Sequence, residues 1–406
     1  MRRTMKTMPW LGVICFIVAL MIAVQPAQAA KKEILIGTHL SLSGVQAAVV
    51  MHQKWAYERA VAAVNRNGGI FVKEYNKKLP VKLIIVDDQS NPTTAAAVVE
   101  RLIKRDKVDL LLSGQTGAIS TVAGMVTAEK FHTYYQCVVM WPQEFVTHHP
   151  KWSTMFFFDP MVGSQMTYKV WQALPENLRP KRPAVISEDT MDGKIVGDGW
   201  EAAGKKYGYT LAPREALTVG AMDFTSQVLQ AKEAGVDAIF CLADTPQIVT
   251  FLRQAKENKY NFMYFQGLKG TWSPDFYKAM GKDGDYIFND GFWSMDFPYK
   301  GAKELGEAWH KKFGTYSVTT GLFYANCQIL FDAIEKAGTL DGQKVRDAVI
   351  KYTHDTVMGP VKYNEEGIAL FDAPDFQWYE GKQQLIYPLN LAKWKVKPIP
   401  PWGTDR

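Results

Sequence analysis

Apolar runs of strand length alternate with helical segments along this chain, and they do so in two separate series. The first series begins with Ile34–Leu40 and continues with strand-like runs at 81–86 and 108–112. The run at 81–86 is almost wholly apolar, which is typical of a parallel strand covered on both faces. Between the first two runs, apolar residues recur at helical spacing from Tyr57, and Gly68 and Gly69 follow as a helix stop.

The alternation restarts near residue 183. Strands are expected at 184–187, 211–216, 236–242 and 263–265, and helices at 194–207 and 246–257. A helical stretch follows at about 302–350, and further strands are expected at 376–379 and 385–391. Two such series predict two α/β lobes with parallel sheets flanked by helices.

The first residues have the features of an export signal. Basic residues near the start precede a short apolar run at 11–24, and Ala27-Gln28-Ala29 matches an A-x-A cleavage site. The run is too short to span a membrane comfortably. We therefore expect a signal peptide at 1–29, cleaved near Ala29, and a soluble protein in the periplasm.

Charge and motifs exclude several classes of function. Without the signal peptide the formal net charge falls from +6 to +3, which does not indicate a nucleic-acid partner. The sequence contains no G-x-S-x-G, H-E-x-x-H or C-x-x-C motif, and Cys137, Cys241 and Cys327 have no zinc spacing. We expect no catalytic residue, no metal and no cofactor.

The run at 108–112 ends in a polar turn, Ser113-Gly-Gln-Thr-Gly117, before the next helix. Glycine turns a strand cheaply, which is one explanation. The other is that free N–H groups at a helix start, with nearby hydroxyls, hold an anion or carboxylate. Open α/β sheets bind ligands beyond the carboxyl ends of their strands, where this turn lies.

Several motifs together resemble a known family. "EILIGTHLSLSGVQA", "VDDQSNPTTAAAVVERLI", "LLLSGQTGAIST" and "PAVISEDTMDGKIVGDGWEAA" follow one another in order. The chain resembles the periplasmic Leu/Ile/Val-binding family of type I solute-binding proteins. These proteins are the receptors of branched-chain amino acid and amide ABC transporters.

The resemblance implies two lobes, joined by three crossing segments, that close on a small ligand. The late helices and strands then divide between the lobes, which we expect at 31–160 plus 297–355 and at 161–296 plus 356–392. The implied function is capture of an amino acid, amide or organic acid and delivery to a membrane permease. We expect a monomer.

The resemblance also places the ligand site. The carboxylate cradle falls on the turn after the third strand and on the exit of the fourth. The second lobe contributes the loops that follow its strands. The expected ligand-binding residues are Gln115, Thr116, Gly117, Ala118, Val139, Met140, Trp141, Asp189, Met191, Asp192, Asp244, Thr245 and Lys269.

This sequence departs from the family pattern at the position that binds the ammonium group of the ligand. The acidic residue that usually pairs with the ligand ammonium falls near Leu268 and Lys269. Either Asp189, Asp192 or Asp244 replaces that acid, or Lys269 is a counter-charge for a ligand without an α-ammonium group. Trp141 would then stack on an apolar or aromatic ligand body.

Two other classes of function remain open from the sequence. One is a sensor that passes its ligand state to a regulatory partner. The other is a secreted hydrolase, against which the missing nucleophile and metal motifs count.

Overall fold

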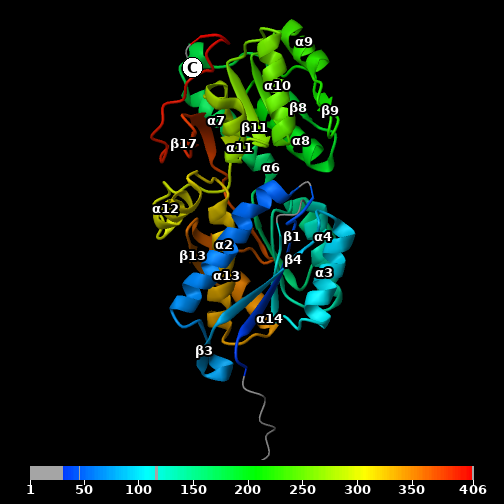
Figure 1. Cartoon of the computed structure of the whole chain (residues 1–406), viewed down its shortest axis with the longest axis vertical. Coiled ribbons are helices and arrows are strands. Elements are labelled where there is room, and N and C mark those ends of the chain that lie inside the picture. Colours follow the sequence, from blue (N-terminus) through cyan, green and yellow to red (C-terminus); the bar gives the residue numbers. More distant parts are fainter. Residues whose placement is uncertain (1–30, 45, 115–117, 405–406) are drawn as a thin grey trace, which may run out of the picture.

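The computed structural model describes residues 31–44, 46–114 and 118–404. The protein has two α/β lobes, which lie one above the other in Figure 1 with the first lobe below. The expected signal peptide at 1–29, together with Gln115, Thr116 and Gly117, lies outside the described residues.

The first lobe is built on a six-stranded sheet in which every pairing is parallel. Its central strand β5 is fully buried, which explains the wholly apolar sequence Leu110–Leu112. In spatial order the strands are β15 (Ile368–Leu370), β7 (Ser153–Phe157), β6 (Tyr135–Val138), β5 (Leu110–Leu112), β1 (Ile34–Leu40) and β4 (Val81–Asp87).

The second lobe has a seven-stranded sheet. Its first five strands pair in parallel, and two antiparallel strands are added at one edge. In spatial order they are β17 (Lys382–Tyr387), β16 (Asp375–Tyr379), β12 (Phe288–Asp290), β11 (Tyr264–Lys269), β10 (Ala238–Ala243), β8 (Pro183–Glu188) and β9 (Glu215–Leu217).

Helices cover the first sheet, and α3 shows why they form where they do. Asn91 caps α3 by accepting the N–H of Thr94, and Pro92 occupies the first helical position. The helices of this lobe are α2 (Ala47–Arg66), α3 (Pro92–Lys104), α4 (Ala118–Lys130), α5 (Pro142–His148), α12 (Ala302–Phe313), α13 (Thr320–Ala337) and α14 (Gly342–Lys351).

Helices also flank the second sheet (Figure 1). They are α6 (Pro160–Gly163), α7 (Met166–Ala173), α8 (Met191–Lys206), α9 (Thr225–Glu233), α10 (Thr245–Glu257) and α11 (Pro274–Met280). Smaller elements are the hairpins β2 (Ile70–Val72) with β3 (Lys77–Leu79) and β13 (Thr353–Thr356) with β14 (Gly359–Lys362), and the 3₁₀ turns η1 (Lys73–Tyr75), η2 (Glu176–Leu178) and η3 (Gly281–Gly284).

The chain crosses between the lobes three times, after β7, after β12 and after β15. One expectation is corrected here, because 356–392 does not lie wholly with the second lobe. Strand β15 pairs with β7 of the first sheet, and β13 packs on α13. The third crossing therefore follows Leu370, since the chain returns to the first sheet before it adds β16 and β17 to the second.

Each crossing contributes phenylalanine rings to one aromatic cluster, which we call the hinge cluster: Phe157, Phe158, Phe292 and Phe371. The ring of Phe157 lies 5.2 Å from that of Phe292 and 6.1 Å from that of Phe371. Phe158 contacts Phe157 at 4.5 Å between ring centroids. The three crossing segments are thus packed against one another.

Within the described part of the chain, no helix combines the length and the apolar character that crossing a bilayer requires.

Candidate functional site

The carboxyl ends of the two sheets meet through one hydrogen bond. Trp141 follows β6 and is the N-cap of α5, while Asp192 lies in the first turn of α8. The indole Nε1 of Trp141 donates to Oδ1 of Asp192 at 2.7 Å. Trp141 is only 7% exposed, so the bond joins the lobes in a sheltered place.

The backbone between β6 and Trp141 is strained. Val139 has a φ of +53°, which is unfavourable for a β-branched residue and typical of positions that serve a site. The side chain of Met140 is fully buried in the hydrophobic core. Of the three residues expected at this strand exit, the structure therefore brings the side chain of Trp141 to the other lobe and buries that of Met140.

Lys269 does not stand alone at the end of β11. Its Nζ lies 2.8 Å from Oδ1 of Asp244, at the N-cap of α10, and 3.2 Å from Oε1 of Glu188, the last residue of β8. Burial alone would lower the pKa of Lys269, but the two carboxylates outweigh burial and raise the pKa. Burial raises the pKa of Glu188, against the pull of Lys269. Lys269 is therefore a charged, paired side chain.

The other expected residues of the second lobe differ in exposure. Asp189 is largely exposed and forms an ion pair with Lys194 at 3.2 Å. Met191 begins α8 and is 49% exposed, while Thr245 begins α10. These residues lie at the carboxyl ends of β8 and β10, as expected, but Asp189 is directed to a surface lysine.

The expected carboxylate cradle is described only at its end. Ala118 begins α4, so the N-terminus of a 13-residue helix follows the turn. Such a terminus carries free N–H groups that favour an anion. The roles of Gln115, Thr116 and Gly117 stay predictions.

Glu144 was missed from the sequence. It lies in the first turn of α5 and accepts the backbone N–H of Trp141, while its other oxygen, Oε2, is buried without a hydrogen-bond partner among the described residues. Burial raises the pKa of Glu144, and the nearby Asp192 raises it further. A signal was present, because a glutamate three residues after an N-cap commonly folds back onto it.

A serine, a histidine and an aspartate do meet in the first lobe, but not in the order that hydrolysis needs. Ser41 donates to Asp88 at 2.6 Å, and Nδ1 of His39 lies 2.7 Å from the same carboxylate. Nε2 of His39 lies 2.6 Å from the hydroxyl of Tyr135. All four side chains are fully buried, so this network ties the exits of β1 and β4 to β6 and does not activate Ser41.

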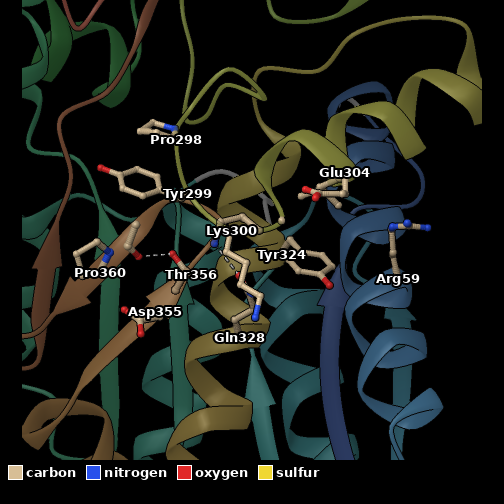
Figure 2. A pocket seen from close by; sticks show the side chains of 14 residues that line it. Arg59, Pro298, Tyr299, Lys300, Glu304, Tyr324, Gln328, Asp355, Thr356 and Pro360 are labelled. Atoms are coloured by element: carbon tan, nitrogen blue, oxygen red, sulfur yellow. Dashed lines mark hydrogen bonds between the residues drawn. The ribbon is translucent and has the colours of Figure 1, made fainter. Parts of the chain in front are cut away.

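An open groove with a volume of about 640 Å³ lies away from the strand ends (Figure 2). Arg59 of α2, Glu304 of α12 and Tyr324 and Gln328 of α13 line it, together with the β13–β14 hairpin. None of the described residues that we expected at the ligand site contributes to it. In addition, no group of three or more His, Cys, Asp or Glu converges as a metal site within the described ranges.

A family model described as "Periplasmic binding protein" matches residues 33–373 of the chain. The Leu/Ile/Val-binding protein homolog 7 of Brucella abortus (strain 2308) is 25% identical over 254 residues. That match covers 57% of this chain and 61% of the relative's length.

Two solved structures share the fold. The substrate-binding protein LivJ of Streptococcus pneumoniae, in complex with isoleucine, is 18% identical with a TM-score of 0.75, over 88% of this chain and all of that one. A solute-binding protein of an ABC transporter from Rhodopseudomonas palustris BisB5, in complex with 3,4-dihydroxy benzoic acid, is 18% identical with a TM-score of 0.72, over 91% of this chain and 99% of that one. At this identity the likeness shows the fold alone. The extent of the family match, together with the two lobes and their facing strand ends, establishes that the chain belongs to the periplasmic binding protein family.

Proposed function

We propose that this protein is the solute receptor of an ABC transporter, which captures a small organic solute between its lobes and delivers it to a membrane permease. The observation that carries the proposal is the bond from Trp141 to Asp192, because it joins the two sets of strand ends where open α/β sheets bind ligands. A solute held there contacts both lobes, so it favours the closed form over the open form.

The solute is either an amino acid or amide, or an organic acid without an ammonium group. Lys269 is already neutralised by Glu188 and Asp244, so it offers little free charge to a solute carboxylate. Asp192 has the Trp141 indole as its hydrogen-bond donor. This arrangement supports an aspartate in place of the missing acid, and hence a solute with a cationic nitrogen. The lobe boundaries that accompany this proposal are 31–160 plus 297–370 and 161–296 plus 371–392.

The function is tested by recovering the solute. The purified protein is denatured and the released small molecules are identified by mass spectrometry. The candidates are then titrated into ligand-free protein, and X-ray scattering follows lobe closure. Uptake of the same solute should fall in cells that lack this chain. A protein that releases nothing, and that neither binds nor closes on amino acids, amides or organic acids, contradicts the proposal.

Replacing Trp141 by phenylalanine should raise the Kd for that solute about ten-fold. The ring contacts with Phe157 and Phe158, both at 5.5 Å, are retained, but the hydrogen bond to the Asp192 carboxylate is lost. Titration calorimetry measures the change. The matched control is Trp272→Phe, which removes an indole bond to Asp290 (2.7 Å) within the second lobe. Equal losses of affinity in the two variants would show that the bond between the lobes has no special role.

A further inference from the structure

Glu144 and Asp192 approach each other from opposite lobes. Glu144 lies on the first turn of α5 and Asp192 on the first turn of α8, and the Trp141 side chain bonds to Asp192 while its backbone N–H bonds to Glu144. Trp141 therefore fixes the position of both carboxylates. Two like charges therefore lie beside one tryptophan.

The surroundings do not balance these charges. Of the other carboxylates at these strand ends, Glu188 and Asp244 pair with Lys269, and Asp189 pairs with Lys194. No ion pair joins Glu144 or Asp192 to a cation among the residues that the structure describes. The Oε2 atom of Glu144 is also buried without a hydrogen-bond partner. A buried carboxylate oxygen without a partner is costly, and a second carboxylate nearby increases that cost.

We infer that Glu144, together with Asp192, holds a cationic nitrogen of the solute between the lobes, so that Glu144 is a specificity-determining residue of the cleft. This inference rests on the proposed function. A cationic nitrogen placed there satisfies Oε2 of Glu144 and relieves the repulsion between the two carboxylates. The second acid acts from the first lobe, on the helix that also carries Trp141. The nitrogen thereby links the lobes through charge as well as through hydrogen bonds.

The inference is tested by comparing pairs of probes that differ only in the ammonium group. L-isoleucine is paired with its 2-oxo acid, and L-phenylalanine with phenylpyruvate. Titration calorimetry gives the ratio of the two Kd values in each pair for the wild-type protein and for Glu144→Gln. Glutamine keeps the size of the side chain and an oxygen for the Trp141 N–H, but it removes the charge.

We expect the wild-type protein to prefer the ammonium member of a pair and Glu144→Gln to reduce that preference about ten-fold. The matched control is Glu58→Gln, an exposed glutamate of α2 that pairs with Lys54, and it should leave the preference unchanged. Asp192→Asn should also reduce the preference, and thermal melting confirms that each variant is folded. A loss of fold in Glu144→Gln transfers the test to Asp192→Asn, which must then show the reduction.

Other results overturn the inference. Glu144 does not determine specificity if the preference for the ammonium member survives in both variants, if it falls equally in Glu58→Gln, or if the wild-type protein prefers the oxo acids. Tight binding of the oxo acids alone leaves the proposed receptor function standing. Binding of neither member of either pair contradicts the inference, and it contradicts the proposed function as well when mass spectrometry finds no released solute.

Discussion

Replacing Gly193 by alanine should raise the Kd for the solute by at least about 100-fold. Gly193 follows Asp192 in the first turn of α8, and a methyl group there would lie 1.9 Å from the carbonyl oxygen of Glu188. That oxygen belongs to the backbone at the end of β8, so the start of α8 must move and carry Asp192 with it. The shift breaks the bond to Trp141 and the contact of Asp192 with the solute, and two charge-assisted hydrogen bonds at about 1.5–3 kcal/mol each correspond to about 100-fold or more in Kd.

The control for this substitution lies on the same helix. A methyl group at Gly197 meets Nη1 of Arg214 at 2.8 Å, and the end of a long side chain moves aside easily. Gly197→Ala should therefore bind the solute nearly as well as the wild-type protein. Titration calorimetry compares the two variants, and circular dichroism verifies the fold of each. Similar Kd values for both would show that the position of Asp192 does not control affinity.

Replacing Asp375 by asparagine should stabilise the ligand-free protein at pH 8 and have little effect at pH 4. Asp375 begins β16 and is fully buried, and burial raises its pKa from 3.8 to about 7. Its carboxyl group accepts hydrogen bonds from Thr167 and Gln266, and Asp290 is nearby. Asparagine keeps an acceptor for Gln266, and its amide donates to the Thr167 hydroxyl.

The direction of this pH dependence follows from the proton that Asp375 binds in the native protein. Between about pH 4 and pH 7 the native protein holds the Asp375 proton and the unfolded chain has released it. The free energy of unfolding therefore falls as the pH rises, by up to about 1.4 kcal/mol per pH unit, and levels off above pH 7. Asparagine does not titrate, so Asp375→Asn removes this fall in the free energy of unfolding. Urea unfolding across this range measures it, with Asp372→Asn as the exposed control. A parallel pH dependence in Asp375→Asn and wild type would refute the assignment.

Local sequence pattern was enough to place most strands and helices. β1 was expected at Ile34–Leu40 and has those bounds, because its mostly apolar run ends at a serine- and glycine-containing segment. The strand expected at 211–216 is confined to Glu215–Leu217. Pro213 explains the difference, since a residue without an N–H group cannot donate to the ladder.

Strand partners were harder to predict than strands. β15 has three residues and pairs with β7, more than 200 positions earlier in the chain. The spacing of apolar residues within a segment does not indicate so distant a partner, so the last boundary between the lobes was misplaced. The pairing of β15 with β7 in the structure places that boundary after Leu370.

The positions of the candidate residues at the strand ends were predictable, but their contacts were not. Asp192, Asp244 and Lys269 lie at strand ends, as expected, because parallel strands bring their carboxyl ends to one edge. The pairing of Lys269 with Glu188 and Asp244 depends on strands that are neighbours in the sheet but distant in sequence. The role of Glu144 depends on burial of one oxygen atom, which a sequence does not report.

The hinge cluster limits which residues of the candidate cleft can change without affecting the crossings. Trp141 packs on two of its rings, those of Phe157 and Phe158, at 5.5 Å between ring centroids in each pair. A substitution of Trp141 therefore also alters the packing at the crossings. Glu144 and Asp192 stand on helix starts and are not part of the cluster. Under the proposed function, we therefore expect changes of solute preference to arise more readily at these two acids than at the tryptophan between them.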